Sequence, residues 1–169
     1  MVNGNDEKCM REALDIAHVC IKDDEMPVGA IVVVNGSVTG KSGPSQFKSK
    51  YFGHGEMIAL NEGIVGRVPR GADIVVYTTM EPCVMCMGAI LHLPITRVVY
   101  ALEDPHGGAT ARLDEWVPPR HQGRLPEIVG GFMREESRAL MREWFETTKN
   151  PYWSSDVGKA TSLYKLCMQ

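Results

Sequence analysis

The fold is decided by residues 74–101, which read IVVYTTMEPCVMCMGAILHLPITRVVYA. Residues 74–78 are apolar and mostly β-branched, which predicts a buried strand. Pro82 suits the first position of a helix, and we expect that helix to run to about His92. Residues 96–101 predict the next strand. A strand, a helix and a second strand in this order indicate a βαβ unit with parallel strands.

The flanking segments extend this unit into an α/β domain. Residues 28–34 predict another buried strand, and Asn35-Gly36 is a strong signal for a two-residue hairpin into a strand near residues 37–40. This hairpin adds an antiparallel edge, so the expected sheet is mixed. The remaining expected elements are helices at 6–22, 54–64 and 134–147, a short strand at 127–129, a loop at 41–53 and an irregular stretch at 104–127.

Size and charge narrow the class of protein. The chain has 169 residues, of which 44% are hydrophobic and 23% charged, and its formal net charge is -3. This length suits one domain, and an acidic balance argues against nucleic-acid binding by bulk charge but permits a local basic patch. No apolar run reaches the ~20 residues of a membrane span, and the start does not resemble a signal peptide. We therefore expect a cytoplasmic protein without a membrane partner.

Two short motifs fall at the starts of two predicted helices. They are His54-Gly55-Glu56 and Pro82-Cys83-Val84-Met85-Cys86. Cys83 and Cys86 are three residues apart, so they share one helix face and can reach one ion, and the helix start favours their thiolate forms. An H-x-E followed by P-C-x-x-C is the signature of zinc-dependent nucleobase deaminases.

The motifs account for a hydrolytic deamination. With His54, Cys83 and Cys86 as protein ligands, a tetrahedral zinc keeps one position open for water, as catalytic zinc sites do. Glu56 lies two residues from His54, projects from another side of the turn and suits a proton shuttle to the ring nitrogen and the leaving amine. We expect one Zn²⁺ per chain.

Two other interpretations of these residues stay open. Cys83 and Cys86 also fit a thioredoxin-like redox pair, which leaves the His-x-Glu motif unexplained. A structural zinc-binding protein needs a fourth ligand, for which His92 and His106 are candidates. The other cysteines, Cys9, Cys20 and Cys167, lack ligand spacing and are expected to be small hydrophobic residues or surface thiols, and Met80, Met85 and Met87 are expected to be core residues.

Three segments resemble bacterial tRNA-specific adenosine deaminases, within the cytidine deaminase-like superfamily. They are residues 77–109, 26–33 (MPVGAIVV) and 127–145 (EIVGGFMREESRALMREWF), and the resemblance spans roughly residues 8–148. It implies a three-layer α/β/α sandwich with a five-stranded mixed sheet, and usually a homodimer. It also implies zinc ligation by His54, Cys83 and Cys86, and a catalytic role for Glu56. The expected organisation is a deaminase domain at 1–148 and a C-terminal arm at 149–169.

The sequence departs from the family at three places that bear on substrate. Gly43 stands where the family has a base-binding Asn, eleven residues before the zinc His. The usual H-A-E is H-G-E, as in fungal cytosine deaminases, and a different C-terminal arm replaces the basic tail. The candidate substrate contacts that the resemblance suggests are Gly29, Ala30, Glu81, Pro82 and Trp144. The aromatic residues Trp144, Phe145, Tyr152 and Trp153 are candidates for a pocket lid or for core and dimer packing.

These departures favour a small base, nucleoside or related aminated heterocycle as substrate, with a tRNA adenosine as the alternative. A stretch in which Lys41, Lys48 and Lys50 alternate with Phe47, Tyr51 and Phe52 suits either a flipped RNA base or a solvated loop. A homodimer is expected through the helix that starts at Cys83, because its apolar residues Val84, Met87, Ile90 and Leu91 exceed what one sheet contact needs.

Overall fold

The computed structural model describes residues 4–43, 52–64 and 68–169, and their strands form one five-stranded sheet. The strands are β1 (Ala30–Val34), β2 (Ser37–Lys41), β3 (Ile74–Met80), β4 (Arg97–Leu102) and β5 (Glu127–Val129). The helices are α1 (Gly4–Lys22), α2 (Gly55–Ile64), α3 (Val84–His92), α4 (Leu113–Trp116), α5 (Pro119–Gln122), α6 (Arg134–Thr147), α7 (Asp156–Lys159) and α8 (Ser162–Met168).

The sheet has the strand order β2-β1-β3-β4-β5 and is mixed, as predicted. β1 pairs antiparallel with β2 and β3, whereas β3, β4 and β5 are parallel. Asn35 and Gly36, which join β1 to β2, both have positive φ angles of 50° and 79°. Left-handed residues at both positions are what a tight hairpin turn of this hand requires, so the Asn-Gly prediction is confirmed.

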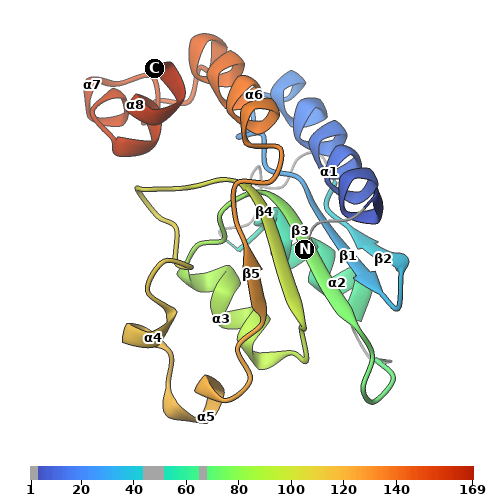
Figure 1. Cartoon of the computed structure of the whole chain (residues 1–169). Coiled ribbons are helices and arrows are strands. Elements are labelled where there is room, and N and C mark those ends of the chain that lie inside the picture. Colours follow the sequence, from blue (N-terminus) through green and yellow to red (C-terminus); the bar gives the residue numbers. More distant parts are fainter. Residues whose placement is uncertain (1–3, 44–51, 65–67) are drawn as a thin grey trace.

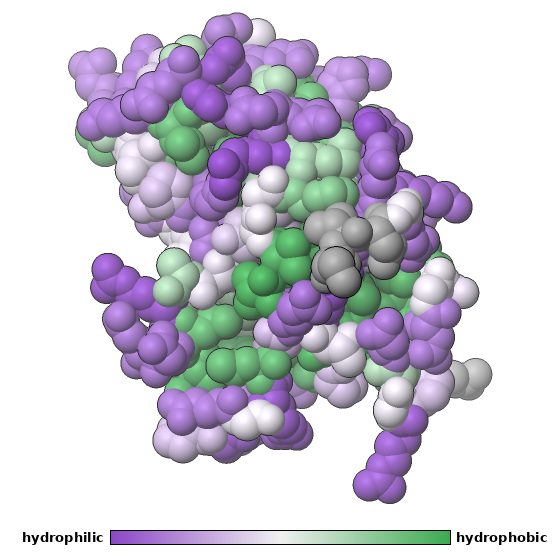
Figure 2. Space-filling model, viewed as in Figure 1, coloured by the Kyte–Doolittle hydropathy of each residue, from purple (hydrophilic) through white to green (hydrophobic). Residues whose placement is uncertain are grey.

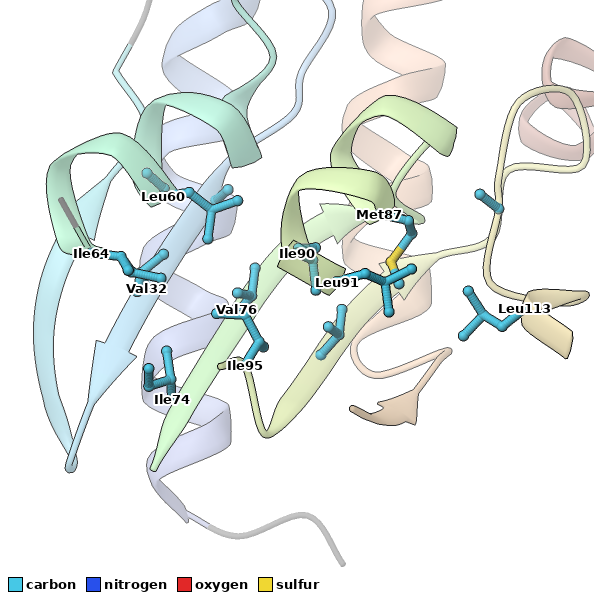
Figure 3. Packing of buried hydrophobic residues seen from close by; sticks show 14 of the residues in the cluster. Val32, Leu60, Ile64, Ile74, Val76, Met87, Ile90, Leu91, Ile95 and Leu113 are labelled. Atoms are coloured by element: carbon cyan, nitrogen blue, oxygen red, sulfur yellow. The ribbon is translucent and has the colours of Figure 1, made fainter. Parts of the chain in front are cut away.

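Helices cover both faces of the sheet and complete the predicted α/β/α sandwich (Figure 1). α2 and α3 lie on one face, and α1 and α6 lie on the other (Figure 1). Side chains alternate along β3, so Ile74 and Val76 join the core under α2 and α3 while Val75 and Tyr77 join the core under α1 and α6. Figure 3 shows the first of these cores, in which Leu60, Ile90 and their neighbours meet over the strands.

Gly29 precedes β1 where α1 crosses the sheet. A Cβ atom at this position would overlap the backbone carbonyl of Ala13 in α1, so no other residue fits without moving the helix. Gly29 also donates its backbone N–H to Thr79 Oγ1 at the end of β3 (3.0 Å). The close approach fixes the loop before β1 against the end of β3, where the site described below begins.

The C-terminal arm is folded, which the lack of a clear sequence period did not predict. α7 and α8 lie beside the end of α6 (Figure 1), and Leu163 and Cys167 enter a third core with Trp144 and Phe145. Residues 104–127 likewise contain two short helices, α4 and α5. Cys9, Cys20 and Cys167 are all buried, as expected of small hydrophobic residues. Within the described part of the chain, no helix has the length and apolar character needed to cross a membrane.

Candidate metal centre and pocket

The two sequence motifs meet at the starts of neighbouring helices. His54 immediately precedes α2, Cys83 is the N-cap residue of α3, and Cys86 lies in the first turn of that helix. Cys83 Sγ and Cys86 Sγ are each 3.6 Å from His54 Nδ1, and the two sulfur atoms are 3.7 Å apart. The structure therefore brings together the three residues that the sequence predicted as metal ligands.

These separations fit one tetrahedral zinc ion. Zinc–sulfur and zinc–nitrogen bonds of about 2.3 and 2.0 Å at tetrahedral angles place two sulfur atoms about 3.8 Å apart and a sulfur and a nitrogen about 3.5 Å apart. The observed distances lie close to both values. Among the described residues the group has three members, so a zinc ion held here keeps one coordination position for a non-protein ligand.

The two thiols differ in acidity. The hydrogen bond between the two sulfur atoms, followed by that with His54, lowers the pKa of Cys83 to about 4. The interaction with Cys83 and burial raise the pKa of Cys86 well above its usual range. A thiol of lowered pKa next to an imidazole suits a soft divalent metal ion, because the thiolate is the form that binds the metal.

Glu56 lies beside this group and is 3% exposed. Its Oε2 accepts a hydrogen bond from Cys86 Sγ (3.5 Å), and its Oε1 accepts one from the hydroxyl of the buried Thr78 (3.3 Å). Burial raises the pKa of the Glu56 carboxyl. Thr78 was missed by the sequence analysis, because nothing in a β-strand pattern shows which face carries a partner for Glu56.

The candidate fourth ligands lie elsewhere. His92, at the other end of α3, contacts the backbone oxygen of Gly88 (2.9 Å) and packs its ring against His121. His106 is exposed, with its ring centroid 6.2 Å from that of Trp153. Neither histidine belongs to the metal-holding group found among the described residues. This arrangement does not support the alternative interpretation as a closed structural zinc site.

A cavity of about 500 Å³ opens beside the metal-holding group. Its described lining residues are Asp24, Glu25, Met26, Val28, His54, Glu56, Met80, Glu81, Cys83, Asp104, Trp144, Asn150 and Trp153. We call His54, Glu56, Cys83 and Cys86 the metal end of the site. We call Trp144, Asn150 and Trp153 the arm wall, since they come from α6 and from the segment that follows it.

The predicted substrate contacts divide into two sets. Glu81 and Trp144 line the cavity. Gly29, Ala30 and Pro82 are buried and lie within two positions of a lining residue in the sequence, but they are not among the described lining residues. Met80, expected to be a core residue, both packs in the third core and lines the cavity.

Glu81 holds the loop that follows β4. Its carboxylate accepts hydrogen bonds from Asp104 N (3.0 Å), Thr110 N (2.9 Å) and Thr110 Oγ1 (2.5 Å). Ala109 N donates to the backbone oxygen of Pro82 (3.0 Å), so the same loop is fixed against the start of α3. Glu81 therefore holds Asp104 in place as well as lining the cavity itself. Asp104 is another lining residue, which the sequence analysis did not identify.

The segment with alternating basic and aromatic residues is described only at its ends. Lys41 pairs with Glu12 of α1, and Phe52 is 72% exposed. Lys48, Lys50, Phe47 and Tyr51 lie outside the described residues. Gly43, the position of the family's base-binding Asn, is half-buried, and a Cβ atom placed there meets no atom of the other described residues, apart from its chain neighbours, within 4 Å.

Comparison with known proteins identifies the chemistry of this site. The family model for the cytidine and deoxycytidylate deaminase zinc-binding region matches residues 3–102. The chain is 32% identical over 145 residues to the tRNA-specific adenosine deaminase of Rickettsia bellii (strain RML369-C), which covers 83% of this chain and 100% of that protein. It is 28% identical over 142 residues to the Bacillus subtilis (strain 168) protein of the same name, covering 83% and 88% of the two chains.

Two solved structures of deaminases are similar to this chain. One from a study of A-to-I editing by tRNA:A34 deaminases at the wobble position of transfer RNA superposes with a TM-score of 0.69, at 28% identity, over 79% of this chain and 99% of that one. A guanine deaminase from Nitrosomonas europaea has the same fold, with a TM-score of 0.62 at 18% identity over 85% of each chain. The chain belongs to the cytidine and deoxycytidylate deaminase family, whose zinc-binding region it contains.

Proposed function

We propose that this protein is a zinc-dependent hydrolase that replaces an exocyclic amino group of a nucleobase, nucleoside or related heterocycle with oxygen and releases ammonia. The observation that carries the proposal is the convergence of His54, Cys83 and Cys86 with a buried Glu56 at one end of a cavity. Water supplies the oxygen atom, the bond between the ring carbon and the amino nitrogen breaks, and ammonia leaves with the protons that it needs.

Each residue of the metal end has a distinct part in this proposal. His54, Cys83 and Cys86 would hold the zinc ion, which as a Lewis acid makes water a nucleophile near neutral pH. Glu56 takes a proton from the water and returns protons to the ring and to the leaving amine. Its raised pKa suits this, because a group that both accepts and donates works best when its pKa lies nearer the operating pH. Thr78 holds one carboxylate oxygen while the other faces Cys86.

The lining of the cavity supports a small substrate without phosphate groups. Five of the described lining residues carry a carboxyl group, and none is lysine or arginine. Two thiolates offset the charge of a zinc ion, so the metal end does not reverse this balance. Like charges in a partly desolvated site repel each other, which disfavours a phosphate close to the reacting ring. The glycine at position 43 and the folded arm in place of a basic tail also favour a small substrate.

Adenosine in a tRNA is the alternative substrate. The curated relatives named above support it, since both are tRNA-specific adenosine deaminases. The two substrates differ in how their binding depends on salt concentration. RNA binding weakens steeply as the salt concentration rises, whereas the binding of an uncharged base is insensitive to it.

An ammonia-release screen on zinc-loaded protein tests the function and separates the two substrates. It covers cytosine, adenine, guanine, their nucleosides, pterins, triazines and an anticodon stem-loop RNA. We expect release from a small heterocycle, and Cys86→Ala to lose most of its zinc and all of this activity. Inosine formed only in the RNA would replace the small-molecule proposal by the alternative. Full zinc and activity in Cys86→Ala would contradict the proposed metal end.

We also propose a homodimer through α3, although fewer of its predicted interface residues are exposed than the sequence suggested. Met87, Ile90 and Leu91 are buried in the core of the same chain, and only Val84 of the four predicted interface residues is exposed, at 60%. Hydrophobic residues nevertheless gather on the face over α3 (Figure 2). Sedimentation at micromolar concentration distinguishes a dimer from a monomer. A cytoplasmic location stays a prediction.

A further inference from the structure

Trp153 brings the C-terminal arm into the cavity. Its indole lines the cavity together with Trp144, and the two ring centroids are 6.1 Å apart at an interplanar angle of 66°. Trp153 also packs against Phe145 at 5.4 Å and His106 at 6.2 Å. The ring therefore has aromatic neighbours on the protein side, and part of its surface faces the space beside the metal end.

The backbone that leads up to Trp153 is held by polar contacts. Asn150 Oδ1 accepts hydrogen bonds from Tyr152 N (3.0 Å) and Trp153 N (3.3 Å). The Asp24 carboxylate accepts bonds from Lys149 N (3.1 and 3.2 Å) and from Thr148 Oγ1 (2.7 Å). Asp24 and Asn150 themselves line the cavity. These bonds join the loop after α1 to the start of the arm, and they fix the place from which Trp153 projects.

Close packing behind Trp153 fixes it further. A Cβ atom at Gly158 in α7 would overlap the backbone oxygen of Tyr152, so α7 rests directly on the backbone that carries the indole. Ser155 accepts a bond from Gly158 N (3.2 Å) and caps the same helix. The position of the ring is thus set by the folded arm before any substrate arrives.

We propose that Trp153 is a substrate-binding and specificity-determining residue that contacts the flat ring of the heterocycle, and that Asp24 and Asn150 are positioning residues for it. The inference rests on the proposed function and specifies which part of the pocket selects the substrate. A preformed aromatic surface binds planar heterocycles by stacking or edge contact, and it costs little conformational entropy because the ring is already fixed. The reacting groups of the metal end need no change to accommodate it.

The test separates binding from chemistry in the zinc-loaded full chain. Stacking on an aromatic residue is worth enough that its removal weakens base binding by about 5–150-fold. We therefore expect Trp153→Ala to raise KM by that factor for the substrate found in the screen, with kcat within a few-fold of wild type. Trp153→Phe keeps an aromatic ring and should retain most of the affinity. Trp116→Phe, in α4 and outside the described lining, is the matched control and should change neither constant.

Substitutions of Asn150 test the positioning role separately. Asn150→Ala removes the acceptor of both backbone bonds and should raise KM several-fold at nearly constant kcat. Asn150→Asp keeps an acceptor oxygen in the same place and should restore KM. A purely structural role would lower the stability of Asn150→Ala without this split between KM and kcat. Unchanged KM in Trp153→Ala, or a fall in kcat alone, would overturn the inference.

A binding measurement keeps the inference testable even if the screen finds no substrate. Binding of purine and pyrimidine bases, measured by calorimetry, should be weakened in Trp153→Ala, largely retained in Trp153→Phe and unchanged in Trp116→Phe. Equal affinity of the wild type and Trp153→Ala would overturn the role of Trp153. Absence of ammonia from every compound with zinc bound would instead contradict the proposed function.

Discussion

The metal end and the arm wall face the same cavity but come from different parts of the chain. His54, Glu56, Cys83 and Cys86 lie within residues 3–102, where the family model matches, whereas Trp144, Asn150 and Trp153 lie beyond it. Short motifs at two helix starts position the metal end. Packing of a whole folded segment positions the arm wall.

This difference assigns separate tasks to the two regions. A hydrolytic deamination needs the same metal ligands and proton carrier whatever the ring, so the metal end is described by a family-wide pattern. The choice of ring depends on contacts to its edges and faces, which the arm wall supplies in our proposal. Substitutions at the metal end should therefore act on kcat, and substitutions at the arm wall on KM or on stability.

The largest effect is expected for Glu56→Ala. One carboxylate serves several proton transfers in the proposed reaction, so turnover should fall by about 10⁴-fold or more, the upper end for general acid–base catalysis. This corresponds to about 5.5 kcal/mol of activation free energy. Zinc content should stay at one per chain, because Glu56 is not in the metal-holding group. Zinc analysis and ammonia release on the same sample measure both quantities.

Glu56→Gln is the matched control, since it keeps the shape and an acceptor for Thr78 but cannot carry the proton. We expect it to be as inactive as Glu56→Ala. A Glu56→Ala variant that holds zinc and deaminates within tenfold of wild type would show that another group carries the protons. The assignment of chemistry to the metal end would then need a different residue.

A smaller effect, on stability, is expected for Leu163→Ala. Leu163 in α8 is 1% exposed and packs in the third core, which holds the arm wall. Truncating a buried leucine costs about 2–5 kcal/mol of unfolding free energy. Chemical denaturation measures the loss, and the partly buried Leu166 provides a control, Leu166→Ala, with a smaller expected loss.

Zinc content sharpens the comparison in the same variant. Native Leu163→Ala should keep its zinc, because the three ligands lie at the starts of α2 and α3 and the arm packs on α6. Loss of zinc from the folded variant would show that the two regions are not independent.

The smallest effect is expected for Thr78→Val. This change removes the hydroxyl that donates to Glu56 Oε1 but keeps a β-branched shape in the strand. One hydrogen bond contributes about 0.5–1.5 kcal/mol, so kcat should fall by roughly 2–12-fold at nearly constant KM. Thr78→Ser should recover the rate. A change in KM alone would place Thr78 with the substrate contacts instead.

The sequence predicted the metal end residue by residue because its signal is local. Cys83 and Cys86 are three positions apart, and each motif stands at a helix start that its neighbours also indicate. The strands and long helices were predictable for the same reason, through hydrophobic period and the Asn35-Gly36 turn. A pattern of this kind needs only a few adjacent residues to be visible.

The arm wall could not be placed in this way. Asp24 and Lys149 are 125 positions apart, and the local sequence around either residue does not predict their contact. Trp153 was a lid candidate from composition alone, with core packing equally open. α7 and α8 are too short to show a helical period, and their positions depend on the packing of Leu163 and Cys167 against α6.

The bond between Asp24 and Lys149 has a consequence for the order in which the protein is made. A ribosome synthesises the chain from its N-terminus, and folding begins while synthesis continues. His54, Cys83 and Cys86 leave the ribosome well before Lys149 and Trp153 do. A nascent chain can thus capture its metal ion while the substrate pocket still lacks a wall, and in our proposal the later-made residues 148–153 turn a zinc-binding fold into a selective enzyme.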